Sequence, residues 1–181
     1  MELVPTEITK CKYLFLDRDG VINVRIIGGY VTCKEEFAFI DGVLDAMSIL
    51  AKHFDYIFLI TNQQGIGKGL MTEDALAEIH KYMTDEIESH GGKMTKIYYC
   101  PYLASEHHPD RKPDIGMGLK AKHDFPEIDF KESVMVGDGI TDIVFGKRLE
   151  MNTVYIGSDE DDSGADYCCS NLKEFADLFN H

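Results

Sequence analysis

The sequence contains no apolar run that approaches the roughly 20 residues a membrane-spanning helix needs. Residues 1–12 also lack the basic start and apolar core of a secretory signal. We therefore expect a cytoplasmic protein with no membrane partner.

Basic residues are few, because 18 lysines and arginines stand against 32 aspartates and glutamates, for a formal net charge of -14. A protein that binds nucleic acid through its phosphates needs an excess of positive charge. No nucleic-acid partner is expected. An anionic substrate must instead be held locally, by a metal ion and a few basic side chains.

Cysteines number five, an odd count scattered along the chain. A chain of 181 residues can bury a core without disulfides, so these thiols are expected to be reduced. The length is typical of a single domain, which we expect over residues 1–181, and we expect that domain to be a monomer.

What the sequence does contain is an alternation of short apolar runs with helical patterns. The apolar runs are typical of strands buried on both faces and cover residues 13–16, 56–60, 97–99, 134–136 and 154–156. Helices are expected after Thr72 and at residues 43–51, 118–123, 142–149 and 172–179. This order predicts an α/β fold, a Rossmann-like, doubly wound and mostly parallel sheet of about five strands.

Acidic motifs follow two of these strands, at the sheet edge where doubly wound folds bind ligands. The first strand runs into Asp17-Arg18-Asp19-Gly20, and the fourth into Asp138. Alone, the first motif is also typical of a turn. A calcium-binding loop is disfavoured, because such a loop has glycine at its sixth position whereas this motif has Gly20 at its fourth. Three carboxylates converging at one edge predict a hard divalent cation, most simply Mg²⁺.

The second strand is followed by Thr61 and Asn62, whose hydroxyl and amide groups can donate hydrogen bonds to an oxyanion. The glycine-rich loop after them fits neither the Walker pattern nor the dinucleotide fingerprint. Arg111 and Lys112 precede a proline; such residues are most often on the surface, but a phosphate site needs a fixed cation. Asp142 falls in the first turn of a helix, where it suits the helix dipole.

In this order the motifs resemble the four motifs of the haloacid dehalogenase superfamily. The matching residues are Asp17 with Asp19, Thr61, Lys112, and Asp138 with Asp142. The segments "GYV", "TNQQGIGKG" and "IYYCP" narrow the resemblance to the bacterial D-glycero-D-manno-heptose 1,7-bisphosphate phosphatases and, less closely, the histidinol-phosphate phosphatases. The resemblance implies an Mg²⁺-dependent phosphatase that hydrolyses a small sugar-phosphate monoester through an aspartyl-phosphate intermediate.

The resemblance also implies roles for individual residues. Asp17 would be the nucleophile and Asp19 the general acid and base, while Thr61 and Lys112 would bind the transferring phosphoryl group. Mg²⁺ would be held by Asp17, the backbone carbonyl of Asp19, and Asp138. Contacts with the substrate are implied for Arg18, Gly29, Tyr30, Asn62, Gln63, Gln64 and Arg111.

Two departures from these relatives stand out. Relatives often carry a zinc site of cysteines and a histidine after the third strand, whereas this chain keeps Cys100 but places Tyr102, His108 and Asp110 at the other ligand positions. Zinc is therefore not expected. An alternative zinc ligand set remains in Cys100, His107, His108 and Asp110. Gly139 stands where relatives commonly place a basic residue, which leaves the exact substrate open.

Three functions remain open: a heptose bisphosphate 7-phosphatase, a histidinol-phosphate or other sugar-phosphate phosphatase, and a catalytically idle binding protein. The stretches from Asp17 to Thr61 and from Thr61 to Lys112 are too short for a cap domain, which needs about 50 further residues. We expect a capless enzyme whose substrate is enclosed by loops at residues 28–31 and 100–110.

Overall fold

The computed structural model describes residues 7–157 and 163–180. Six strands form one parallel sheet in the order β3-β2-β1-β4-β5-β6. The strands are β1 (Tyr13–Leu16), β2 (Tyr56–Asn62), β3 (Lys96–Cys100), β4 (Ser133–Gly137), β5 (Asn152–Ile156) and β6 (Tyr167–Cys169). The predicted doubly wound parallel sheet is confirmed, and the expected count of about five strands is one too few.

The additional strand, β6, lies at the edge of the sheet and pairs with β5 alone. It has three residues, and only Cys169 among them is fully buried. A strand this short and half-buried leaves no apolar run in the sequence, which is the signal from which the other five were predicted.

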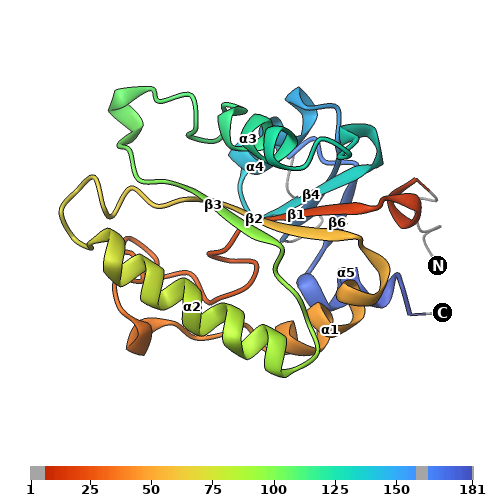
Figure 1. Cartoon of the computed structure of the whole chain (residues 1–181), viewed down its shortest axis with the longest axis horizontal. Helices are drawn as coiled ribbons and strands as arrows, with labels where there is room; N and C mark the ends of the chain where they lie inside the picture. Colours follow the sequence, from red (N-terminus) through yellow and green to blue (C-terminus); the bar gives the residue numbers. More distant parts are fainter. Residues whose placement is uncertain (1–6, 158–162, 181) are drawn as a thin grey trace.

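Helices cover both faces of the sheet (Figure 1). One layer contains α1 (Val43–His53), α2 (Glu73–Ser89) and α5 (Leu172–Asp177), and the other contains α3 (Gly116–Asp124) and α4 (Ile140–Arg148). Side chains of β1 alternate between the two cores. Leu14 and Leu16 pack with the first layer, whereas Tyr13 and Phe15 pack with the second. The apolar run of β1 is therefore explained by burial on both sides.

The helix α2 begins where the sequence predicts. Thr72 Oγ1 accepts a hydrogen bond from the backbone N of Ala75 at 3.1 Å, which satisfies one of the free donors of the first turn. The buried face of α2 carries Leu76, Ile79, His80, Met83 and Ile87. His80 is the polar residue among these five, and its ring contacts Arg18 of the first motif.

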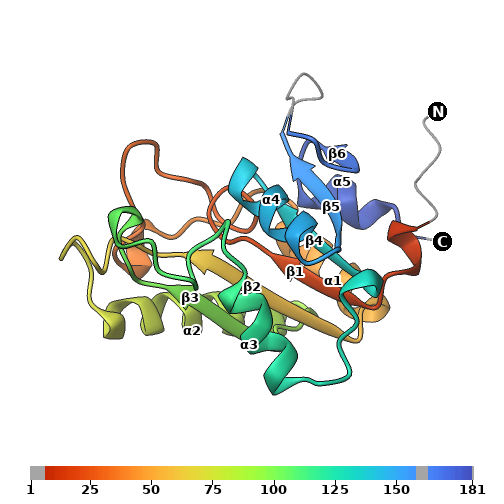
Figure 2. The same cartoon turned by 90° about the horizontal axis from the view of Figure 1, so that it is seen from above.

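The segments between the motifs are short (Figure 2). From Asp17 to Thr61 the chain forms a 3₁₀ turn (Lys34–Glu36), α1 and β2, and from Thr61 to Lys112 it forms α2, β3 and a second 3₁₀ turn (Ala104–Glu106). Within the described residues neither stretch builds a cap, as expected. In the same part of the chain, no helix has the length and apolarity to cross a membrane.

Candidate active site

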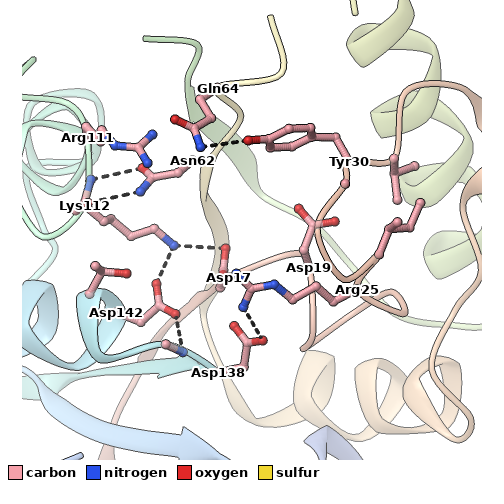
Figure 3. Close-up of a pocket in the computed structure, with 15 residues that line it drawn as sticks. Asp17, Asp19, Arg25, Tyr30, Asn62, Gln64, Arg111, Lys112, Asp138 and Asp142 are labelled. Atoms are coloured by element: carbon pink, nitrogen blue, oxygen red, sulfur yellow. Dashed lines mark hydrogen bonds and ion pairs between the residues drawn. The ribbon is translucent and has the colours of Figure 1, made fainter. Parts of the chain in front are cut away.

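The ends of β1, β2 and β4 meet at one edge of the sheet, where they and the loops beyond them form a pocket of about 290 Å³ (Figure 3). This volume suits a small molecule. The pocket brings together nine of the predicted site residues: Asp17, Asp19, Gly29, Tyr30, Asn62, Gln64, Arg111, Lys112 and Asp138.

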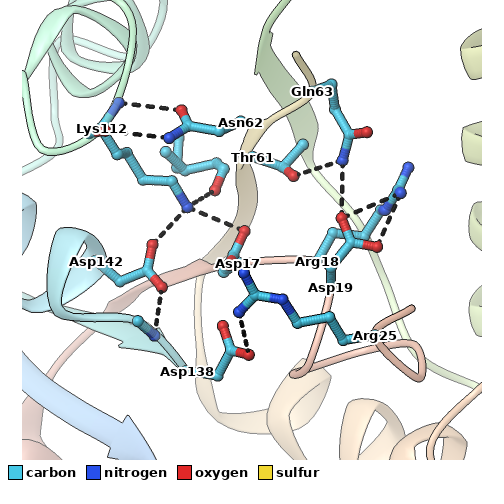
Figure 4. A network of polar contacts seen from close by, with 12 residues as sticks. Asp17, Arg18, Asp19, Arg25, Thr61, Asn62, Gln63, Lys112, Asp138 and Asp142 are labelled. Atoms are coloured by element: carbon cyan, nitrogen blue, oxygen red, sulfur yellow. Dashed lines mark hydrogen bonds and ion pairs between the residues drawn. The ribbon is translucent and has the colours of Figure 1, made fainter. Parts of the chain in front are cut away.

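Lys112 lies between two carboxylates on one side of this pocket (Figure 4). Its Nζ is 3.0 Å from Asp17 Oδ1 and 2.6 Å from Asp142 Oδ1, and it donates a hydrogen bond to the carbonyl of Ile60 at 2.6 Å. Burial acts to lower the pKa of Lys112, but the carboxylates of Asp142 and Asp17 raise it above its ordinary value. Lys112 is therefore a buried cation beside Asp17, and the two carboxylates favour its charged form.

The backbone of Lys112 is held by Asn62 at the end of β2. Asn62 Nδ2 donates to the carbonyl of Lys112 at 3.1 Å, and the N–H of Lys112 donates to Asn62 Oδ1 at 3.0 Å. This pair of hydrogen bonds joins two segments 50 residues apart. Asn62 lines the pocket as predicted, and it also fixes the position of the lysine.

Asp17 continues β1, and its backbone N–H donates to the carbonyl of Val136 in β4 at 3.0 Å. Burial, together with the carboxylate of Asp142, raises the pKa of Asp17 to about 7, against the opposing effect of Lys112. Carboxylate oxygens of Asp17, Asp138 and Asp142 lie within 4.8 Å of one another. Carboxylates this close repel each other unless a cation lies among them.

The carboxylate cluster fits a magnesium ion, because Mg²⁺ prefers hard oxygen ligands and few of them from protein. Asp142 is already engaged, since it accepts hydrogen bonds from Lys112 and from the backbone N–H of Gly139 at 3.1 Å. Asp17 and Asp138 each use one oxygen in an ion pair, with Lys112 and with Arg25, so the second oxygen of each is the group offered to a metal. The expected ligand set stays a prediction.

Two residues of the segment after β1 determine the surroundings of Asp138. Gly20 has a φ of +85°, and a Cβ at this position would lie 2.0 Å from Asp138 Oδ2, so both the backbone and the space require glycine. Arg25 Nη1 is 3.1 Å from the same oxygen. Sequence reasoning missed Arg25, and the signal available was a basic residue between Asp19 and Tyr30.

Asp19 lies at the pocket wall, where three side chains fix its carboxylate (Figure 4). Arg18 Nη2 donates to Oδ1 at 3.0 Å and to Oδ2 at 3.1 Å, Asn23 Nδ2 donates to Oδ1 at 2.9 Å, and Gln63 Nε2 donates to Oδ2 at 3.0 Å. Burial acts to raise the pKa of Asp19, but the charge of Arg18 and these hydrogen bonds hold it below its usual range.

The expected substrate contacts of Arg18 and Gln63 are wrong. Arg18 has no exposed surface, and its guanidinium is directed away from the pocket to His80. Arg18 lies in the bend after β1, which ends at Leu16, and there its side chain is buried against His80 of α2. Gln63 is 1 % exposed and donates to Asp19 and to Thr61 Oγ1, the latter at 2.9 Å. Both residues support the site from behind.

Thr61 is also almost fully buried, at the end of β2. Its hydroxyl accepts the hydrogen bond from Gln63 and does not line the pocket. The expected contact of Thr61 with a phosphoryl group stays a prediction.

The four residues at the zinc positions of relatives are engaged in other contacts. The ring of Tyr102 stacks on that of His108 with 3.8 Å between centroids, Asp110 forms an ion pair with Lys120, and Cys100 is buried at the end of β3. Among the described residues, the group of side chains close enough to share a metal ion is the carboxylate cluster of Asp17, Asp138 and Asp142. The expected absence of zinc stays a prediction.

A parallel sheet that carries this lysine and these carboxylates at one edge defines a phosphatase of the haloacid dehalogenase class. Residues 15–177 match the family model described as polynucleotide kinase 3 phosphatase, and the chain belongs to that family.

Two curated relatives are similar over most of their length. The chain is 37 % identical over 171 residues to the D-glycero-alpha-D-manno-heptose-1,7-bisphosphate 7-phosphatase of Campylobacter jejuni, covering 94 % of this chain and 96 % of the relative. It is also 37 % identical over 151 residues to the corresponding beta-heptose enzyme of Haemophilus influenzae, covering 79 % of this chain and 80 % of the relative.

A solved structure agrees with these relatives. The D,D-heptose 1,7-bisphosphate phosphatase of B. bronchiseptica, complexed with magnesium and phosphate, matches with a TM-score of 0.83 and 25 % identity. The match covers 93 % of this chain and 98 % of that chain. It is therefore a likeness of the whole fold.

Proposed function

We propose that this protein is an Mg²⁺-dependent phosphatase that removes the 7-phosphate of D-glycero-D-manno-heptose 1,7-bisphosphate. The observation that carries the proposal is Asp17 itself, a buried carboxylate at a strand end beside a fixed lysine and a second acidic residue, Asp138, suited to a metal. The relatives named for heptose bisphosphate, in both anomeric forms, support the choice of substrate.

The reaction assigns a separate task to each of the two aspartates of the first motif. An oxygen of Asp17 forms a bond to phosphorus as the ester bond to the sugar oxygen breaks. The leaving oxygen takes its proton from Asp19, which must first bind a proton from solvent because its pKa is held below the usual range. Asp19 then accepts a proton from the water that attacks the aspartyl phosphate. This second step releases inorganic phosphate and regenerates Asp17.

The phosphoryl group carries most of its charge on the oxygens that do not react. Lys112, fixed at 3.0 Å from Asp17 Oδ1, binds one of these oxygens, and the hydroxyl of Thr61 binds another. Asp17, Asp138 and the backbone carbonyl of Asp19 would hold Mg²⁺, whose charge would offset further negative charge on the phosphoryl group. Because Asn62 fixes the lysine before substrate arrives, little reorganisation is needed during the reaction.

The far end of the substrate is bound by loop residues at the rim of the pocket. Tyr30 Oη accepts a hydrogen bond from Gln64 Nε2 at 2.8 Å, which joins the loop after β1 to the loop after β2. Arg111 reaches the rim from the third side and donates to the carbonyl of Tyr102 at 3.3 Å. Arg111 is the side chain assigned to the second phosphate.

A substrate panel tests the proposal. Phosphate release is measured from heptose 1,7-bisphosphate, histidinol phosphate and p-nitrophenyl phosphate, each with and without Mg²⁺. We expect the highest kcat/KM with heptose bisphosphate. A preference for histidinol phosphate would overturn the choice of substrate, and no hydrolysis of any of the three would overturn the enzymatic function.

Removal of divalent metal ions is expected to stop catalysis, and added Mg²⁺ is expected to restore it.

Binding of Mg²⁺ should also strengthen as the pH rises through about 7, because the raised pKa of Asp17 means that the metal must displace a proton below that pH. Isothermal titration of the metal-free protein on both sides of this pH measures the effect. Affinity that is independent of pH, or activity that survives thorough chelation, would contradict the assigned metal site.

Replacement of Arg111 with alanine is expected to raise KM for heptose bisphosphate far more than KM for p-nitrophenyl phosphate. A lost charged hydrogen bond costs about 1.5 to 3 kcal/mol, equivalent to roughly 10- to 150-fold in KM. Lys81→Ala is the control, since it also removes a basic side chain, one that pairs with Asp85 on the exposed side of α2. If Arg111→Ala affects both substrates equally, Arg111 does not bind a second phosphate.

A further inference from the structure

Arg18 is a buried cation for which the reaction described above has no use. It is among the largest side chains with no exposed surface, although arginine is rarely buried unless it is paired. Its Nη2 is committed to the carboxylate of Asp19, and its Nη1 lies 3.2 Å from His80 Nε2. Within the described residues its Nε has no hydrogen-bond partner, so the guanidinium is oriented by the other two nitrogens.

His80 is the polar residue on the buried face of α2, and it is 7 % exposed. An arginine is always protonated and can only donate, so His80 Nε2 must be the acceptor in this contact. Burial, followed by the charge of Arg18, lowers the pKa of His80 to about 3, which keeps the ring neutral and its Nε2 free to accept. The ring is also packed against Tyr99, with 6.3 Å between centroids.

The contacts form a chain from a helix to the pocket wall. His80 is a residue of α2, and its Nε2 accepts a hydrogen bond from Arg18 Nη1. Arg18 Nη2 in turn donates to both carboxylate oxygens of Asp19. Asn23 and Gln63 also donate to Asp19, each to one oxygen. Arg18 donates to both oxygens and is the charged donor of the three, so it orients the carboxylate together with Asn23 and Gln63.

We propose that His80 is a positioning residue for the reaction: it fixes the guanidinium of Arg18, which in turn orients the carboxylate of Asp19 toward the leaving oxygen. This inference rests on the proposed role of Asp19 as general acid. Without an acceptor at position 80, Arg18 Nη1 is left buried and unpaired, and the guanidinium must shift to find one, taking Asp19 with it.

The test is the rate at which Asp17 becomes phosphorylated in a single turnover, measured by rapid quench with two substrates. The sugar oxygen of heptose bisphosphate needs a proton to leave, whereas p-nitrophenolate leaves without one. A well-placed general acid contributes about 10²- to 10⁴-fold, and misplacement loses part of this. We expect His80→Leu to slow phosphorylation by the sugar phosphate about tenfold or more and by the aryl phosphate less than about threefold.

Two further variants separate positioning from a loss of structure. The side-chain carbonyl of His80→Gln can accept the bond from Arg18, so this variant is expected to recover most of the rate with the sugar phosphate. Ile79→Val trims the buried face of the same helix without touching Arg18, and it should affect both substrates alike. Thermal unfolding of each variant shows whether it remains folded under assay conditions.

The inference is overturned if His80→Leu slows both substrates equally, if it slows neither, or if His80→Gln is as impaired as His80→Leu. Asp19→Asn is the reference for the proposed function. If Asp19→Asn itself does not discriminate between the substrates, the proposed role of Asp19 fails and the inference fails with it. If Asp19→Asn discriminates and His80→Leu does not, the inference alone is wrong.

Discussion

Replacement of Asp17 with asparagine is expected to abolish turnover while leaving the protein folded. The amide has the shape of the carboxylate but is a far weaker nucleophile, so no aspartyl phosphate forms. Uncatalysed hydrolysis of phosphate monoesters is among the slowest of reactions, with enzymatic accelerations up to about 10²¹, so the loss should reach several orders of magnitude. Steady-state phosphate release and mass spectrometry of the quenched enzyme measure it.

The fold should survive this change because Lys112 keeps a second carboxylate partner in Asp142. Asp85→Asn is the matched control, since it makes the same chemical change on the exposed side of α2, where Asp85 pairs with Lys81. Asp85→Asn is expected to be fully active. Near-normal activity of Asp17→Asn would contradict the covalent mechanism.

Replacement of Lys112 with methionine is expected to impair both stability and turnover. The change leaves the carboxylates of Asp17 and Asp142 close together and without their shared cation. Removing one partner of a buried ion pair costs about 3 to 5 kcal/mol, which for a chain of this size lowers the Tm by roughly 10 °C. Turnover should also fall by several orders of magnitude, because the ammonium group of Lys112 binds the transferring phosphoryl group.

Lys81→Met is the control for this experiment. Lys81 pairs with Asp85, their side chains are 75 % and 57 % exposed, and exposed pairs contribute about 0 to 1 kcal/mol. Differential scanning calorimetry of the two variants in the absence of metal compares them directly. If Lys112→Met unfolded at the same temperature as Lys81→Met, the buried ion pair would contribute nothing to stability.

Most of the fold follows from patterns that are local in the sequence. The strands β1, β2, β4 and β5 are apolar because helices cover both faces of the sheet, whereas the edge strand β3 exposes Lys96 and Tyr99. The helix α2 begins after Thr72 because that residue caps it. The strand β6 could not be predicted in this way, since it is short and lies at the sheet edge, where only Cys169 is buried. Its three residues carry little information of their own.

In the candidate site too, some residues could be predicted from local sequence patterns and others could not. Asp17, Asp19 and Asp138 could be placed together in advance, because the carboxyl ends of neighbouring parallel strands must meet. The contribution of His80 could not, because its contact with Arg18 joins residues 62 positions apart through helix packing. Arg18 was misassigned because it stands between two site residues, and its burial against His80 is a tertiary contact that the motif does not indicate.

The nucleophile and the rim of the pocket belong to different parts of the architecture. Asp17 extends a central strand with a neighbour on each side, whereas Arg25, Tyr30 and Arg111 come from three positions on surface loops. Substitutions in those loops can alter which sugar is accepted without disturbing the reacting groups. A laboratory effort to redirect this catalyst to another phosphate ester should therefore randomise the loops and leave the strand ends unchanged. Related enzymes can change substrate in the same way, by substitutions in these loops.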